Sequence, residues 1–290
     1  MSEALRRIPL ACPIDGLALR AEERRFVCER GHAYDLSRHG HVNLLPVQFK
    51  PSRDPGDDAA MVASRRRVLD GGLFDPLADL LAEHVHALAG EDEGGRAAAL
   101  LVDAGCGEGF YTHRLAGRVP PGVAVLGVDI SRHAVSAAAR RHRERVGWAV
   151  ANNKRLPVLA GRADIVTSLF GFETWSPWAA LQEPGQSVVV VDAGPRHLIE
   201  LREIAYERVR LHAAPSDEAA SRAGYRLEDE RSLAYVRAGL DAATLADVLA
   251  MTPHAHRARA GARETIASRA ATDLTVDVTV RTYRRQARVR

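Results

Sequence analysis

The sequence has 290 residues, of which 46% are apolar and 27% are charged, as is usual for a globular protein. Its net charge of +3 decides nothing about partners by itself, and its three cysteines predict thiols rather than a disulfide framework. No apolar run approaches the roughly 18 residues of a membrane helix, and the N-terminus has no signal-peptide core. We therefore expect a cytoplasmic protein with no membrane partner.

Residues 1–45 are rich in turns and contain a group of cysteines and histidines. In CPIDGLALRAEERRFVCERGH, the residues Cys12, Cys28 and His32 stand at the spacings of a small zinc-binding knuckle. Asp15 occupies the position where a second cysteine would close the first pair. The pattern predicts a small N-terminal domain and leaves its metal content open.

Residues 46–95 are expected to connect this domain to the rest of the chain. LLPVQFKPSRDPGDD (44–58) contains three prolines and a glycine, which predicts an irregular linker. From residue 57 onward, apolar residues recur at helical spacing and predict two helices separated by a Gly-Gly pair (71–72). The second helix is expected to start at an Asp-Pro pair (75–76).

The remaining residues, 96–290, alternate short apolar runs with helical segments, which predicts an α/β fold with a doubly wound, mostly parallel sheet. Buried strands are expected at residues 97–105, 123–131, 146–157, 163–172 and 186–194. Helices are expected at residues 109–119 and 131–146. The last segment, TDLTVDVTVRTYRR (272–285), alternates strictly and predicts an antiparallel strand with one solvent-facing side.

The basic residues are nearly all arginine. Lys50 and Lys154 are the only lysines among 40 basic residues. A GC-rich genome explains this bias, although the Arg fork also suits phosphate oxygens. The last ten residues, RTYRRQARVR, hold five arginines and no acid. Such a basic tail is either solvated or able to hold a polyanion.

A glycine-rich loop follows the first strand of the large domain. In VDAGCGEGF, Asp103, Gly105, Gly107 and Gly109 lie where the backbone can approach a ligand and a helix N-terminus offers unpaired N–H groups. Asp129 follows Gly105 by 24 residues and ends the next strand, where an acid can accept hydrogen bonds from two ribose hydroxyls. The pattern predicts an adenosine-containing cofactor.

The details of this loop favour S-adenosylmethionine. A dinucleotide site usually has G-x-G-x-x-G, whereas this loop is G-x-G-x-G preceded by Asp103. A carboxylate there suits the sulfonium and α-amine of S-adenosylmethionine better than it suits a pyrophosphate. In a purely structural alternative, Asp103 caps the loop and Asp129 caps the following helix.

Several stretches along nearly the whole chain resemble one family. They are CP…C…GH, HVNLLPVQFKPSRDPGDDAAMVASRRRVLDGGLFDPL, DAGCGEGFYTHRL, GVDIS, RLPV and GPRHLIELR. Together they resemble the bacterial 23S ribosomal RNA guanine-N1 methyltransferases, whose members include macrolide-resistance enzymes. The resemblance implies a zinc-ribbon-like RNA-recognition domain, then a Rossmann-like class I methyltransferase domain that uses S-adenosylmethionine. It further suggests a homodimer, with a hairpin loop of 23S ribosomal RNA as the partner.

The resemblance also implies which side chains contact the cofactor, besides the glycine loop and Asp129. They are Phe74, Tyr111, Thr112, Asn152 and His197. Structural alternatives exist for most of them. The aromatic residues suit a core, Asn152 suits a turn, and His197 suits a helix start bonded to solvent.

The family's zinc ligands are three cysteines and a histidine. The matching positions are Cys12, Asp15, Cys28 and His32. A carboxylate can bind zinc at about 2.0–2.2 Å, against about 2.3 Å for sulfur. Two hypotheses follow: a weakened zinc site with one carboxylate, or a metal-free relic braced by hydrogen bonds. His39 and His41 are nearby substitutes or surface residues.

A second departure from the family lies after the fourth strand, in SLFGFETWSPW (168–178). The family has an aromatic residue, a small residue and a proline; here Phe170 keeps the aromatic and Phe172 replaces the proline. On this substrate-side loop, Phe172, Trp175 and Trp178 are expected either to stack on a planar base or to pack in the core.

Three functions compete at this point. Guanine-N1 methylation of 23S ribosomal RNA, as a housekeeping or an antibiotic-resistance modification, is favoured by the N-terminal signature and the basic tail. Methylation of a small planar heterocyclic natural product is favoured by the altered ribbon and loop. Binding without catalysis is disfavoured by the intact glycine loop. Glu173 is the candidate base for the guanine N1 proton, with a surface role as the alternative.

Overall fold

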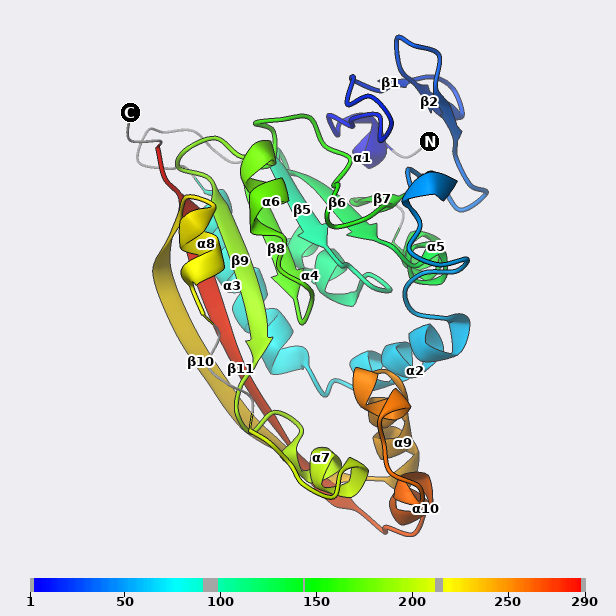
Figure 1. Cartoon of the computed structure of the whole chain (residues 1–290), viewed down its shortest axis with the longest axis vertical. Helices are drawn as coiled ribbons and strands as arrows, with labels where there is room; N and C mark the ends of the chain where they lie inside the picture. Colours follow the sequence, from blue (N-terminus) through cyan, green and yellow to red (C-terminus); the bar gives the residue numbers. More distant parts are fainter. Residues whose placement is uncertain (1–2, 91–98, 143, 212–215, 288–290) are drawn as a thin grey trace.

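A central sheet of eight strands and a small sheet of three organise the molecule (Figure 1). The computed structural model describes residues 3–90, 99–142, 144–211 and 216–287. The large sheet has the order β10-β11-β9-β8-β5-β6-β7-β4. Strands β4 to β9 pair in parallel, whereas β11 pairs antiparallel with both β9 and β10. This confirms the expected Rossmann-like, doubly wound fold with an antiparallel C-terminal strand.

The strands after residue 98 match every apolar run named in the sequence. The large sheet comprises β4 (Val42–Asn43), β5 (Leu100–Ala104), β6 (Ala124–Asp129), β7 (Gly147–Val150), β8 (Ile165–Leu169), β9 (Ser187–Ala193), β10 (Tyr225–Leu240) and β11 (Thr272–Arg285). The small sheet comprises β1 (Arg20–Ala21), β2 (Arg25–Val27) and β3 (Ala33–Asp35). The first two residues of the run expected at 97–105 lie outside the described residues.

The helices surround the large sheet and are held by local caps. They are α1 (Glu3–Arg6), α2 (Ala59–Asp70), α3 (Asp75–Ala89), α4 (Phe110–Arg118), α5 (Arg132–Arg141), α6 (Trp175–Leu181), α7 (Ile199–Ala205), α8 (Glu218–Arg222), α9 (Ala242–Ala250) and α10 (Ala262–Ala267), with 3-10 turns η1 (Val47–Phe49) and η2 (Pro253–His256). The Asp58 side chain accepts from Met61 N and starts α2, and Ser131 does the same for α5 through Ala134 N. The Gly-Gly pair separates α2 from α3, as expected.

Two hydrophobic cores lie on the two faces of the large sheet. Successive residues of a strand point to opposite faces, so Val189 and Val191 join the core beneath α3, whereas Val188 and Val190 join the core that contains the tryptophans of α6. The second core also contains Leu5 and other residues of the N-terminal segment. The N-terminal segment therefore shares a core with the large sheet.

The N-terminal segment also joins the large sheet directly. Val42 pairs in parallel with Ala149, which makes β4 the edge strand beside β7. Leu10 forms an isolated bridge with Val158 just beyond the same strand. The small sheet is thereby fixed above β7, at the upper right of Figure 1. It follows that the N-terminal segment, residues 3–45, has a fixed position relative to the large sheet.

The arginines of the C-terminal segment serve the fold, which corrects the expectation of a free basic tail. Arg281 lies in β11 and is 1% exposed, between Asp192, Asp217 and Glu173. Arg284 pairs with Glu228, and Arg285 donates to the carbonyl oxygens of residues 223 and 224. These three guanidiniums are committed to internal partners; residues 288–290 lie outside the described residues.

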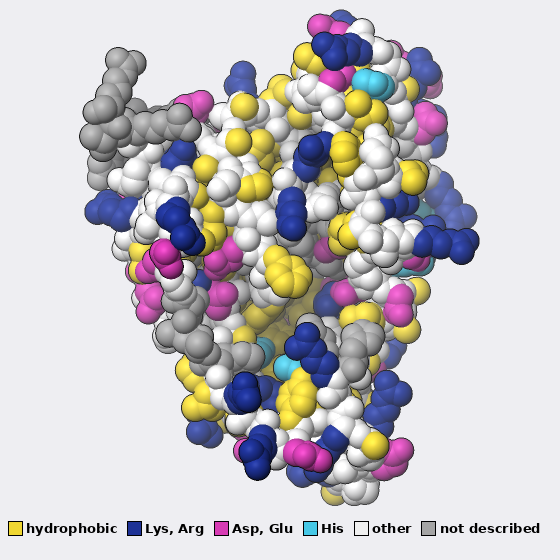
Figure 2. All heavy atoms as spheres, in the orientation of Figure 1, with side chains coloured by type: hydrophobic (Ala, Val, Ile, Leu, Met, Phe, Trp, Pro, Cys, Tyr) yellow, Lys and Arg dark blue, Asp and Glu magenta, His cyan; other side chains and the backbone are white. Residues whose placement is uncertain are grey.

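Helices from the C-terminal third close the lower side of the sheet (Figure 1). α9 and α10 are inserted between β10 and β11, and α9 packs against α2. Arg67 of α2 donates to both oxygens of Asp247 in α9, at 2.5 and 2.6 Å. The face of the molecule shown in Figure 2 is hollowed near its centre. Within the described ranges, no helix is both long and apolar enough to cross a membrane.

Candidate active site and metal centre

The glycine loop between β5 and α4 has the backbone that its glycines allow. Gly105, Gly107 and Gly109 all have positive φ, at 94°, 55° and 89°. The N–H groups of Gly105 and Cys106 both donate to the Val128 carbonyl oxygen, at 2.8 and 2.9 Å, which ties the loop to β6. A Cβ on Gly109 would lie 2.6 Å from Cη2 of Trp148. The loop is therefore tightly packed at Gly109, whereas a Cβ on Gly105 or Gly107 would meet nothing closer than 3.5 Å.

Asp129 is the acid at the end of β6, as predicted. Its Oδ2 accepts from Gly107 N at 2.9 Å, and its Oδ1 accepts from Ser131 N at 2.8 Å. Burial raises the pKa of this carboxyl, while the two backbone donors oppose that rise. Because the side chain is half-buried, it can still accept hydrogen bonds from a ligand above the loop.

Asp103 has a supporting position, which corrects the expectation that it faces the cofactor. The side chain is 1% exposed, and its oxygens accept from Thr112 Oγ1 at 2.5 Å and from Thr167 Oγ1 at 2.8 Å. Burial raises its pKa to about 6, against the effect of these two hydroxyls. Asp103 therefore links β5 to α4 and β8 beneath the loop. The Thr112 hydroxyl takes part in this link, so it too supports the loop rather than facing the cofactor.

The Tyr111 hydroxyl is a candidate contact for a bound ligand. Its oxygen is buried but has no hydrogen-bond partner among the described residues, and burial raises the tyrosine pKa well above its ordinary value. A buried polar atom without a partner is costly. The residue is second in α4, directly after the glycine loop. A polar ligand at the helix N-terminus, such as the amino-acid part of S-adenosylmethionine, would satisfy this hydroxyl.

Three aromatic rings from separate segments lie close together. Phe74 precedes α3, Phe170 follows β8, and His197 precedes α7; their ring centroids lie 5.4 to 6.2 Å apart. His197 is buried rather than solvated, and its Nδ1 accepts from Asp277 N at 3.3 Å. Phe170 has a φ of 52°, a strained conformation for a residue with a side chain. The structure thus gathers two predicted cofactor residues with the predicted substrate-side aromatic.

The substrate-side loop separates its aromatic residues into two groups. Phe172 is 88% exposed, so its ring is available to a partner. Trp175 and Trp178 are buried and lie edge to face at 5.3 Å within α6. Of the two alternatives left open by the sequence, Trp175 therefore follows the core one, because its ring completes the core with Tyr225 and Tyr283.

Glu173 anchors this loop to the sheet. Its Oε2 accepts from the Trp175 indole N–H at 2.7 Å, and its Oε1 accepts from Arg281 Nη2 at 3.1 Å. Burial raises the pKa of the carboxyl. Because both oxygens are engaged with the fold, the geometry favours a positioning role over that of a general base.

Asn152 and its neighbours form the turn after β7. The Asn152 side-chain oxygen accepts from Lys154 N at 2.9 Å, which is the turn that its residue type favours. Asn153 O accepts from Thr174 Oγ1 at 3.1 Å. The turn therefore borders both the glycine loop, through Asn153 and Gly105, and the substrate-side loop.

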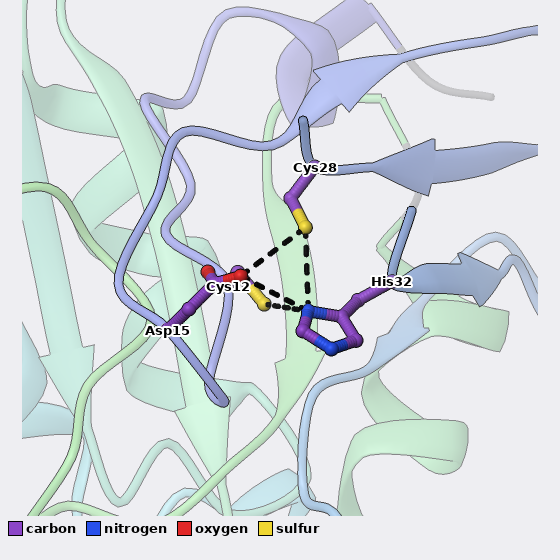
Figure 3. Close-up of side chains that lie close together, drawn as sticks. All are labelled: Cys12, Asp15, Cys28 and His32. Carbon is purple, nitrogen blue, oxygen red and sulfur yellow. Dashed lines mark hydrogen bonds and ion pairs between the residues drawn. The ribbon is translucent and has the colours of Figure 1, made fainter. Parts of the chain in front are cut away.

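The four predicted metal ligands converge in the N-terminal segment (Figure 3). Two turns supply them, CPIDG and CERGH; in each turn the glycine has a positive φ and its N–H donates to the cysteine carbonyl oxygen. His32 Nδ1 lies 3.0 Å from Asp15 Oδ2, 3.5 Å from Cys12 Sγ and 3.4 Å from Cys28 Sγ. His39 and His41 lie outside this cluster.

The cluster fits a zinc ion. In a tetrahedral site the ligand atoms lie about 3.3–3.8 Å apart, and the four donor atoms here are all within 4.8 Å of one another. The Asp15 carboxylate is oriented by Leu17 N, which donates to Oδ1 at 3.0 Å and leaves Oδ2 facing the cluster. The Tyr34 hydroxyl lies 3.2 Å from Cys12 Sγ, where it can donate to a thiolate. Cys12, Asp15, Cys28 and His32 would hold the metal and cross-link the two turns.

Sequence analysis did not identify Arg65 or Arg281. Arg65 of α2 pairs with Asp57, donates to Met251 O at 2.9 Å, and would lie 3.8 Å from a Cβ on Gly107. In the sequence, Arg65 is marked only by its position on the predicted helix that follows the linker. Arg281 was assigned to the basic C-terminal tail, residues 281–290. The alternating pattern of that segment does not show which of its arginines is buried.

Comparisons with known proteins agree with this site. Residues 10–53 match the family described as RlmA, N-terminal, a zinc ribbon, and residues 101–183 match a methyltransferase domain. The chain is 31% identical, over 93% of its length and 94% of the other, to YxjB of Bacillus subtilis (strain 168), provisionally named a 23S rRNA (guanine-N(1)-)-methyltransferase. It is 34% identical, over 70% of both chains, to the 23S rRNA (guanine(748)-N(1))-methyltransferase of Streptomyces fradiae. The crystal structure of BH2331 from Bacillus halodurans C-125, provisionally named a methyltransferase, has a similar fold. The TM-score is 0.50 at 13% sequence identity, and the match covers 72% of this chain and 98% of BH2331.

The fold and site define an S-adenosylmethionine-dependent methyltransferase with an N-terminal zinc ribbon. The predicted class of enzyme and its cofactor are thereby confirmed. The chain belongs to the 23S rRNA (guanine-N1)-methyltransferase family, which confirms the resemblance seen in the sequence.

Proposed function

We propose that this protein methylates N1 of a guanine in a hairpin loop of 23S ribosomal RNA, in the cytoplasm. The observation that carries the proposal is the end-to-end relationship with YxjB, which includes the ribbon as well as the catalytic domain. The ribbon supports it further, because its four donor atoms keep the geometry of a metal site despite the Asp15 change. A homodimer remains a prediction, to be checked by sedimentation of the purified chain.

The residues of the site would mainly position the reactants. S-adenosylmethionine supplies a methyl group on a sulfonium, which leaves as a neutral thioether. Asp129 and the glycine loop would hold the adenosine end, and the Tyr111 hydroxyl would bind the amino-acid end. Phe170 and Phe172 would present flat surfaces to the guanine. Alignment of the reacting atoms then provides most of the acceleration.

The guanine N1 proton must also leave, because N1 attacks through the electron pair of the N–H bond. A proton acceptor within hydrogen-bond reach would promote this step. Glu173 is engaged on both oxygens, so a backbone carbonyl of the substrate-side loop is the better candidate to accept a hydrogen bond from N1–H and orient it. The proton itself would then pass to water as the N–H electron pair forms the new bond to the methyl carbon. The left-handed Phe170 turns the backbone at this point and distinguishes the loop from a plain strand end.

A methyl-transfer assay tests the proposed substrate. The full-length protein, with radiolabelled S-adenosylmethionine and protein-free 23S ribosomal RNA, should place label on the RNA at a hairpin-loop guanine. The competing function is methylation of a small planar heterocycle, which the exposed Phe172 ring and the carboxylate in the ribbon favour. Label on a small aromatic compound with none on RNA would establish that alternative and overturn ours.

Glu173→Gln should leave RNA methylation within about threefold of the unaltered protein, with the same pH–rate profile. The glutamine oxygen can still accept from Trp175 or Arg281 and hold the loop. Removal of a general base typically lowers the rate about 10²- to 10⁴-fold. Single-turnover rates between pH 6 and 9 distinguish the two cases, and a fall of that size would restore Glu173 as the base.

A further inference from the structure

A cavity of about 230 Å³ lies between the ribbon and the turn after β7. One wall is apolar and comes from the N-terminal segment and linker: Pro13, Leu44, Leu45, Pro46 and Phe49. The other wall is polar and comes from the turn: Asn152, Lys154 and Arg155. The cavity is thus built jointly by the ribbon side and the catalytic domain, and the mechanism above does not use it.

Neither cation of this cavity has a carboxylate partner in the part of the chain that the structure describes. Lys154 and Arg155 are exposed, and within the described ranges neither forms an ion pair. The described lining contains no acidic residue. Most arginines near the catalytic centre, by contrast, are paired, as Arg65 is with Asp57 and Arg67 is with Asp247. Unpaired cations at a concave surface favour an anionic ligand.

The guanidinium of Arg155 lies over an aromatic ring. Its central carbon lies 4.2 Å from the centroid of Phe49. Its Nη1 donates to Pro13 O at 3.3 Å, which ties it to the residue after the ligand Cys12. An ordered guanidinium over a ring is the kind of platform on which unpaired bases stack. Lys154 is fixed through its backbone by Asn152 and can reach a phosphate.

The cavity also lies next to the place where the acceptor base must enter. The turn that forms its polar wall is bonded to the substrate-side loop through Asn153 O and Thr174 Oγ1. On this face, Lys and Arg side chains stand between the ribbon and the central hollow (Figure 2). A base in the catalytic site and a base in the cavity would belong to neighbouring nucleotides.

We infer that this cavity binds a nucleotide of the RNA that flanks the methylated guanine, with its base on the Phe49–Arg155 platform and its phosphate on Lys154. The inference rests on the proposed RNA substrate and adds to it a subsite that selects an unpaired neighbour of the target. Recognition of splayed bases in loops works in this way elsewhere.

The test measures affinity of the full-length protein for a fluorescent hairpin fragment of 23S ribosomal RNA across a salt series. Phe49→Ala should weaken binding about 5- to 100-fold at every salt concentration, because one stacked base is lost. Phe49→Trp should restore most of the affinity. Lys154→Ala should lower the slope of log K against log salt by about 0.7, the value for one phosphate contact on a single strand.

Arg162→Ala is the matched control, since Arg162 is exposed and makes no bond among the described residues. It precedes β8 at the amino end of that strand, whereas the cavity lies beyond the carboxyl end of β7. Melting temperature, zinc content and S-adenosylmethionine binding should be unchanged in all variants. If the cavity variants bind RNA as the control does while methylation proceeds, the subsite is refuted and the proposed function stands. If they lose affinity but the RNA is never methylated, the subsite stands and the acceptor is wrong. If the unaltered protein binds no RNA, both fail.

Discussion

Cys28→Ala should yield a protein that purifies without zinc and methylates RNA at least tenfold more slowly, yet still binds S-adenosylmethionine. Cys28 Sγ lies 3.4 Å from His32 Nδ1 and 3.5 Å from Asp15 Oδ2, so its loss removes one corner of the donor set. Structural zinc sites contribute directly to folding, at about 10–16 kcal/mol in zinc-finger peptides. Metal analysis of the purified chain, together with transfer and calorimetric assays, measures all three properties.

The structural effect of losing zinc should stay within the ribbon, because zinc is not the only interaction that holds the fold of the ribbon together. Phe26 and Leu19 belong to the core that contains Leu10 and the strands of the large sheet. Without the metal, the turns at residues 12–16 and 28–32 lose their cross-link, while this core persists. The cavity wall at Pro13 adjoins the first turn. RNA binding should therefore suffer while the cofactor site, at the carboxyl ends of β5 and β6, is spared.

Asp15→Cys provides the opposite change at the same site. A third thiolate should slow the loss of zinc to a chelator relative to the unaltered protein, because structural sites bind zinc best with cysteine and histidine. His39→Ala is the control and should keep its zinc, since His39 lies outside the cluster. An unaltered chain that carries no metal, beside an Asp15→Cys variant that does, would establish the metal-free relic instead.

The sequence predicted the parts of the fold in which burial leaves a pattern. Strands β5, β6, β8 and β9 are fully or nearly buried, so their residues form continuous apolar runs. β10, in contrast, was not predicted. It is an edge strand, YRLEDERSLAYVRAGL, in which Tyr225 alone is buried and one side is at most half-buried, so charged residues interrupt its hydrophobic period.

The candidate site was predictable where a residue type has one structural use. Glycines with positive φ fall into that class. Residues with two uses were not settled by the sequence: Asp103 proved to be a support and Trp175 a core residue. Both outcomes depend on partners distant in the chain, Thr167 for the aspartate and Tyr283 for the tryptophan. Local sequence contains no information about such contacts.

Asp129→Asn should weaken S-adenosylmethionine binding about 100-fold and lower RNA methylation accordingly. The carboxylate already accepts from Gly107 N and Ser131 N, and its remaining lone pairs would accept the two ribose hydroxyls. Hydrogen bonds to a charged group contribute about 1.5–3 kcal/mol each, and 1.4 kcal/mol is a factor of ten. The asparagine also turns an N–H group toward one of the two backbone donors, which disturbs the loop itself.

The pH dependence of cofactor binding should report the protonation of the Asp129 carboxylate. Burial raises the pKa of Asp129, so the acceptor becomes protonated at a higher pH than an ordinary aspartate does, and affinity should fall as the pH drops through that raised value. Titration calorimetry of the unaltered protein and Asp129→Asn over a pH series measures both effects, and Asp229→Asn, on exposed β10, is the control. If Asp129→Asn bound the cofactor as tightly as the control at neutral pH, the ribose would have to be held elsewhere, and the cofactor orientation on which the proposed chemistry depends would be wrong.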